Sequence, residues 1–222
     1  MCEQNFSKQI NPQIRVYVAN LSKYVEGELV GEWLNLPATH NEIKNFLKNK
    51  VRLNKTHEEY AIHDYESDFR FGEYENIYDL NLLAVKLEQM SENEKNVTIA
   101  YCSANGLRDT LSILNVCEQA SEIAYVTIDA NDCGSKEEKL GYAMLEEIDT
   151  DLKATLEQCK IGTNLNAYTY FDFEAYGRDT EINEGYFANE EIFIFYTTDI
   201  DHNLYTIQEI KEKIDDPRLE ET

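Results

Sequence analysis

Segment 1–75 alternates between hydrophobic and polar positions in a manner typical of β-strands. In the stretch QIRVYVAN, the apolar residues Ile14, Val16 and Val18 are separated by Arg15 and Tyr17. This period of two indicates a strand with one buried face. The stretches GELVGEWLNLP, which ends at a proline, and EEYAIHDYE have a similar character. We therefore predict strands at 13–20, 27–37 and 58–66.

Four Ser or Thr residues, each followed three positions later by Glu, predict the beginnings of helices. In such a capping box, the two side chains accept hydrogen bonds from backbone N–H groups that have no partner within the helix. The pairs are Thr39 with Glu42, Ser91 with Glu94, Ser135 with Glu138, and Thr206 with Glu209.

The spacing of hydrophobic residues changes to a helical period between 76 and 120. Ile77, Leu80, Leu83 and Leu87 lie on one face of a helix with this spacing, and a second apolar stripe follows Gly106, where we expect a helix to end. The C-terminal part of the chain, from 121 onward, mixes both periods. It predicts a strand at 122–129, a strand or hairpin at 185–197, and helices at 150–159 and 166–179, the latter ending at Gly177.

These changes of period indicate the α+β fold class and three small domains. We predict an antiparallel sheet with a helix at 1–75, a helical domain at 76–120, and a mixed α+β domain at 121–222. No internal repeat and no linker rich in Pro, Gly or Ser interrupts the chain.

The net charge of −23 is the most unusual property of the chain. Residues 1–57 contain 5 acidic and 8 basic residues, whereas residues 58–222 contain 38 acidic and 12 basic residues. Acidic surfaces repel nucleic acids and anionic membranes and attract basic proteins. We therefore expect a basic protein partner, and we expect neither nucleic acid nor a membrane to bind.

The motifs of catalysis and of cofactor binding are missing from the sequence. Neither glycine-rich phosphate loop occurs, nor do GxSxG or HExxH. Segments 129–140 and 199–210 imitate calcium loops, but each lacks the glutamate needed at its twelfth position. The five cysteines are scattered, which is typical of free thiols in a reducing compartment. We expect a cytoplasmic protein that is not an enzyme and that has no cofactor or metal.

The acidic residues match the charge of a length of duplex DNA. Duplex DNA has one charge per roughly 1.7 Å, so the 26 excess charges of residues 58–222 equal about 13 base pairs. Acids three and four positions apart on a helix lie ~5–6 Å apart and form a row. Acids in segment 134–153 can form such a row. On charge alone, however, the simpler interpretation is favoured, in which the acids only keep the protein soluble.

Three blocks of sequence resemble the ArdA antirestriction family. They are YVEGELVGEWLNLP at 24–37, EEYAIHDYE at 58–66 and FDFEAYGRD at 171–179, and ANLSKY before the first block also fits. The resemblance covers about residues 14–198. It implies an elongated, three-domain protein that imitates B-form DNA and blocks type I restriction-modification enzymes by occupying their DNA-binding groove. It also implies a homodimer formed through the C-terminal domain.

The chain departs from this resemblance at both ends. Segment 1–57 is basic on balance, with a cluster of lysines and arginines at 44–55, and the segment after about 198 is an extension. Within the blocks we expect Trp33 in the core, and we expect Tyr60, Ile62, Tyr65, Tyr176 and Gly177 to serve packing and turns.

We expect the acids near these blocks and in segment 129–151 to meet the basic partner. They are Asp64, Glu66, Asp68, Glu73, Glu75, Asp129, Asp132, Glu137, Glu138, Glu146, Glu147, Asp149, Asp151, Asp172, Glu174 and Asp179. An alternative remains open, in which an acidic interaction protein sequesters another basic DNA-binding partner.

Overall fold

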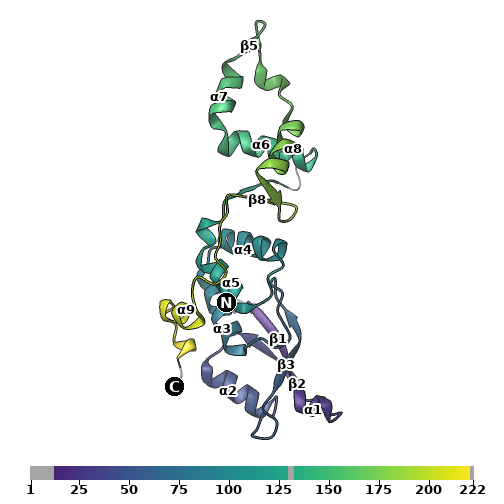
Figure 1. Ribbon diagram of the computed structural model, residues 1–222, viewed down its shortest axis with the longest axis vertical. Helices are drawn as coiled ribbons and strands as arrows, with labels where there is room; N and C mark the ends of the chain where they lie inside the picture. Colours follow the sequence, from purple (N-terminus) through teal and green to yellow (C-terminus); the bar gives the residue numbers. More distant parts are fainter. Residues whose placement is uncertain (1–12, 130–132, 221–222) are drawn as a thin grey trace, which may run out of the picture. The chain divides into compact units, whose positions relative to one another are not determined.

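The chain forms two compact units of mixed α+β structure, which confirms the predicted fold class (Figure 1). The computed structural model describes residues 13–129 and 133–220. Unit 1 consists of residues up to 91, 107–117 and those from 202 onward, and unit 2 consists of 92–106 and 118–201. The chain therefore passes between the units several times. The three domains predicted at 1–75, 76–120 and 121–222 stay a prediction, as do the elongated shape and the dimer.

A three-stranded antiparallel sheet forms the centre of unit 1, as the alternation of its sequence predicts. Its order is β2-β1-β3, with β1 at Ile14–Asn20, β2 at Gly31–Leu36 and β3 at Tyr60–Glu66. The side chains of Ile14, Val16 and Val18 are fully buried on one face. On the other face Trp33 packs edge-on against Tyr17 and is half-buried, so the expectation that it belongs to the core is wrong.

The helices of unit 1 begin largely where the local sequence predicts. Both capping boxes, Thr39 with Glu42 and Thr206 with Glu209, are formed. The side chain of Asn20 caps a short helix that the periodicity does not indicate. The helices are α1 (Leu21–Val25), α2 (His40–Asn49), α3 (Ile77–Gln89), α5 (Thr110–Glu118, whose last residue belongs to unit 2), α9 (Ile207–Lys213) and the 3-10 turn η4 (Pro217–Leu219).

Unit 2 contains a second antiparallel sheet with helices around it. The sheet order is β4-β8-β7, with β4 at Tyr125–Thr127, β7 at Gly185–Phe187 and β8 at Ile192–Phe195. The strands and the hairpin at 185–197 are confirmed. The other elements are α4 (Glu92–Ala104), η1 (Ala120–Glu122), α6 (Lys136–Ala143), the π-helical turn η2 (Met144–Ile148), α7 (Thr150–Gln158), β5 (Lys160–Ile161), β6 (Leu165–Asn166), η3 (Ala167–Tyr170) and α8 (Phe173–Asn183).

The prediction that a helix at 166–179 ends at Gly177 is wrong. Asp172 begins a new helix, and Gly177 lies in the middle of α8. A Cβ atom at Gly177 would lie 1.8 Å from the carbonyl oxygen of Glu137 in α6, and one at Gly141 would lie 2.1 Å from that of Phe173. The two glycines therefore bring the backbones of α6 and α8 into close contact, and neither is a helix end.

Candidate partner-binding surface

The excess of negative charge is concentrated in unit 2. This unit contains 22 acidic and 6 basic residues, a net charge of −16, whereas unit 1 contains 21 acidic and 14 basic residues, a net charge of −7. Because each basic residue neutralises one carboxylate, sixteen carboxylates of unit 2 have no basic residue of the unit to balance them. The negative potential of the chain is therefore strongest over unit 2.

In unit 1, the predicted acids lie on β3 and in the loop that follows it. Asp64, Asp68 and Glu73 are exposed. Glu66 is exposed as well, but both of its carboxylate oxygens accept hydrogen bonds from Arg15, at 3.0 and 3.1 Å. The Arg15 guanidinium also lies over the Trp33 ring, 4.6 Å from its centroid. Glu66 is thus locally neutralised.

Glu75 is half-buried and has a structural role within unit 1. Its carboxylate accepts hydrogen bonds from the Thr110 hydroxyl at 2.5 Å and from the Thr110 backbone N–H at 3.1 Å. Since Thr110 is the first residue of α5, Glu75 satisfies a donor at the start of that helix. Burial and then the nearby charge of Glu75 raise the pKa of Asp79.

In unit 2, one group of predicted acids lies on α6, η2 and α7. Glu146, Glu147 and Asp151 are exposed, while Glu137 and Glu138 are half-buried. Lys153 donates to Glu146 at 2.5 Å, and Tyr168 donates to it at 3.2 Å. The hydrogen bond from Lys153 is the main cause that lowers the pKa of Glu146. Lys153 therefore neutralises Glu146 locally.

Asp149 and Asp179 lie together around a hollow of about 570 Å³. Its lining includes the apolar residues Met144, Ile148 and Phe195, and no basic residue among those that the structure describes lines it. The Tyr176 hydroxyl donates to Asp149, and burial together with this hydrogen bond raises the pKa of Tyr176. Glu184, which sequence reasoning did not single out, also lines this hollow.

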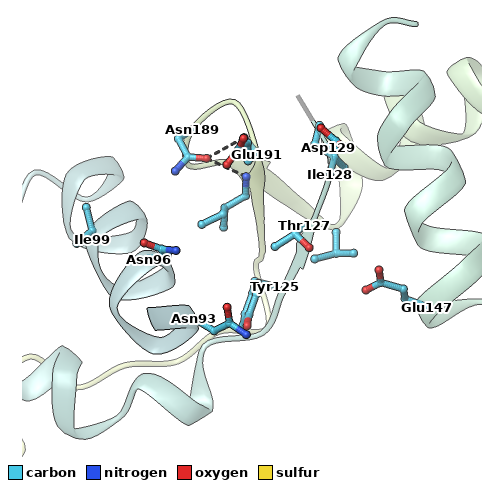
Figure 2. A pocket seen from close by; sticks show the side chains of 12 residues that line it. Asn93, Asn96, Ile99, Tyr125, Thr127, Ile128, Asp129, Glu147, Asn189 and Glu191 are labelled. Carbon is cyan, nitrogen blue, oxygen red and sulfur yellow. Dashed lines mark hydrogen bonds between the residues drawn. The ribbon is translucent and has the colours of Figure 1, made fainter. Parts of the chain in front are cut away.

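Asp129 and Glu147 line a second hollow, of about 720 Å³ (Figure 2). Glu191, another acid that the motifs did not indicate, lies at its edge with Asn189, whose side chain accepts from the backbone N–H of Glu191. No sequence signal distinguishes Glu184 and Glu191 from other acids, because only the fold brings them to these hollows. Asp132 lies outside the described residues.

The two predicted acids of the third block lie at the start of α8. Asp172 is the N-cap and accepts a hydrogen bond from the Ala175 backbone N–H at 2.9 Å. Glu174 forms an ion pair with Arg178 one turn later, at 3.2 Å. Asp172 and Glu174 are both exposed, so Asp172 keeps its negative charge at the surface while Glu174 shares its charge with an arginine.

Neither a metal centre nor a membrane span is found in the part of the chain that the structure describes. Within it, no three side chains of His, Cys, Asp or Glu are grouped to hold a metal ion. None of its helices has both the length and the apolar character needed to cross a bilayer.

Comparison with protein families gives one match that covers most of the chain. The model of the family described as "Antirestriction protein (ArdA)" matches residues 16–195. No curated protein matches the chain significantly. The matched region includes most of β1, the acid-bearing loop after β3, and nearly all of unit 2. Since the match spans far more than half of the 222 residues, the chain belongs to the ArdA family of antirestriction proteins.

Proposed function

We infer that the chain inhibits type I restriction-modification enzymes by imitating B-form DNA and occupying their DNA-binding groove. The observation on which this depends most is the excess of sixteen negative charges in unit 2. With one charge per roughly 1.7 Å of duplex, this equals about 27 Å, or about 8 base pairs, in each chain. A homodimer would present twice that charge to one enzyme.

The inhibitor acts by binding alone and is not an enzyme. Lysines and arginines that hold phosphates in the groove instead meet exposed carboxylates such as Asp151 and Asp179. The hollow at Asp149 accommodates the aliphatic part of such a side chain on Met144 and Phe195, while the acids around it face the charged end. Because a single exposed ion pair stabilises little, affinity comes from the number of pairs formed together.

A competition experiment tests this function directly. A purified type I methyltransferase core is mixed with labelled target DNA, and the full-length chain is titrated in. We expect the DNA to be displaced, with an affinity for the inhibitor that falls steeply as NaCl is raised. Cells that express the chain should also fail to restrict unmodified phage.

The same titration separates this function from the alternative. If DNA stays bound to the methyltransferase core while a different basic DNA-binding protein, such as a nucleoid protein, is displaced from its DNA, then the chain sequesters another partner. Unchanged restriction in cells together with no displacement would refute inhibition of type I enzymes.

A further inference from the structure

Strand β4 leaves one of its two edges unpaired in unit 2. Among the described strands, β4 pairs only with β8, which lies between β4 and β7. The backbone N–H of Ile128 donates to Glu191 at 2.8 Å, and the N–H of Phe195 donates to Ala124 at 3.0 Å. Because hydrogen-bonded pairs alternate in an antiparallel ladder, the N–H and C=O groups of Tyr125 and Thr127 point away from the sheet.

The hollow of about 720 Å³ runs along this free edge. Its lining includes Tyr125 and Thr127, whose side chains are exposed, and also Val126 and Ile128, which point to the opposite face of the strand. Val126 belongs to the core formed with Leu140 and Phe193. Residues from both faces of β4 line the hollow and β8 pairs with the other edge of β4, which places the hollow beside the free edge.

The walls of this hollow combine polar and acidic residues with isoleucines and a valine. Figure 2 shows Asn93 and Asn96 of α4 on one side of β4 and Glu147 of η2 on the other. Glu191 lies just before β8 begins, and within 13–129 and 133–220 no lysine or arginine lines the hollow. Its volume is within the ~300–1,000 Å³ range of ligand sites.

We propose that the β4 edge binds an extended, basic segment of the partner protein by strand addition. The main chain of the segment pairs with Tyr125 and Thr127, which supplies affinity, while its lysines and arginines meet Glu147 and Glu191. A β-strand satisfies the unpaired edge groups, and complementary charge selects a basic strand over a neutral or acidic one.

This site differs in kind from a charged surface that imitates phosphates, because main-chain pairing requires an extended polypeptide. That the segment belongs to a restriction enzyme rests on the proposed function, whereas peptide binding at the edge does not. The site therefore predicts a contact to the protein partner that DNA itself does not make.

The test measures binding of a fluorescein-labelled peptide, KVRVKVR, to the full-length chain by fluorescence anisotropy. The control peptide has the same sequence with every backbone amide N-methylated, so it keeps the charge but has no backbone N–H donors. We expect the control to bind at least about tenfold more weakly. Equal binding of the two peptides would show attraction by charge alone and overturn the proposal.

Variants of the chain locate the site. Thr127→Pro removes an edge N–H and should abolish peptide binding, with circular dichroism checking that the variant folds. The double variant Glu147→Gln and Glu191→Gln should weaken binding several-fold, whereas Glu174→Gln, remote from the edge in sequence and already paired, should not. If Thr127→Pro instead converts a dimer into monomers in sedimentation experiments and the peptide never binds, the edge is occupied by a second copy and the proposal is wrong.

The same variants distinguish the proposal from the proposed function. Loss of peptide binding by Thr127→Pro, with weaker but measurable displacement of DNA from a methyltransferase core, supports both. A chain that displaces DNA but does not bind the peptide refutes only the edge site. A chain that binds the peptide but never displaces DNA supports the edge site and refutes inhibition of the restriction enzyme.

Discussion

At the scale of single residues, the close approach of α6 and α8 depends on the absence of two side chains. The glycines at 141 and 177 face each other across the helix crossing, and the atoms that a Cβ would meet are backbone atoms. Backbone atoms cannot rotate away as the end of a flexible side chain can. A methyl group at either position must therefore push the helices apart.

We predict that Gly177→Ala destabilises the protein although alanine is the better helix former. Alanine favours a helix over glycine by up to ~1 kcal/mol, but overpacking typically costs ~1–3 kcal/mol and more where the backbone must shift. We expect the free energy of unfolding in urea to fall by about 1–3 kcal/mol. Ile182→Ala, at an exposed position of the same helix, should change it little. A Gly177→Ala variant as stable as the parent would contradict the packing.

A second prediction separates neutralised from free carboxylates on the proposed binding surface. Glu66, Glu146 and Glu174 pair with Arg15, Lys153 and Arg178, respectively. Their triple replacement by glutamine should weaken binding to a methyltransferase core less than the triple replacement Asp68→Asn, Asp151→Asn and Asp179→Asn. Both triple variants change the net charge by the same amount, so the comparison isolates position.

The two triple variants should differ in affinity because paired and unpaired carboxylates produce different electrostatic potentials at the surface that the partner contacts. A carboxylate held by a guanidinium or ammonium group presents a dipole, whereas Asp68, Asp151 and Asp179 are exposed and form no ion pair among the described residues. We expect the second triple variant to lose roughly tenfold or more in affinity, and the first several-fold less, in competition titrations. Equal losses would mean that only total charge matters.

At the scale of secondary-structure elements, local sequence signals predicted where elements begin better than where they end. Thr39 and Thr206 begin helices because the capping box is closed within one helical turn. The helix end at Gly177 was predicted wrongly because a glycine can either end a helix or allow another helix to pack closely against it. The sequence of α8 does not distinguish the two roles, since the second depends on the presence of α6. The hairpin β5–β6 is too short to leave an alternating pattern.

The capping box of α2 predicts a difference in acid sensitivity. Hydrogen bonds from the backbone N–H and hydroxyl of Thr39 lower the pKa of Glu42 below its ordinary 4.5. Glu42 is therefore ionised more readily in the folded state, and its contribution to stability is full above pH 4.5 and is lost as pH falls through the lowered pKa.

Comparison with Glu42→Gln measures this contribution, because glutamine also closes a capping box but has no charge. We expect the parent protein to be more stable than the variant at neutral pH, with the difference vanishing as urea titrations are repeated at progressively lower pH below 4.5. Charge repulsion elsewhere is common to both proteins and largely cancels. A difference that stays constant with pH would rule out the ionised cap.

At the scale of the whole molecule, distant segments of sequence complete each unit. Residues from 202 onward belong to unit 1, where Ile210 is fully buried and Arg218 pairs with Glu88 at 2.7 Å. This segment lies beyond the family match, which ends at 195. The capping box of Thr206 and Glu209 indicated the helix of this segment but not its place in the fold, because pairing between segments far apart along the chain leaves no local pattern.

We predict that Ile210→Ala destabilises the protein by about 2–5 kcal/mol, the usual cost of a large-to-small change in a core. Glu212→Ala, at an exposed position of the same helix, is the matched control. Urea unfolding of both variants gives the measurement. An unaffected Ile210→Ala variant would show that the C-terminal segment adds nothing to unit 1.

The negative charge of the chain lowers the stability of the folded protein, and the same charge favours binding of a basic partner. The excess negative charges, which give the net charge of −23, repel one another within each folded molecule. Ion pairs such as Lys153 with Glu146 lie at the surface. Exposed pairs of this kind stabilise a protein by only ~0–1 kcal/mol each. Repulsion therefore outweighs attraction inside the protein, and the same carboxylates attract a basic groove.

Salt should consequently act in opposite directions on the two equilibria. The Debye length is about 10 Å at 0.1 M salt and shortens as NaCl is added. We expect the midpoint of urea unfolding to rise with added NaCl, because repulsion is screened, while affinity for a methyltransferase core falls roughly tenfold or more. The second triple variant described above, which has three fewer negative charges, should respond less in both measurements. If salt lowered stability and affinity together, the carboxylates would have to be held mainly by internal ion pairs, and a surface that imitates DNA could not be made from them.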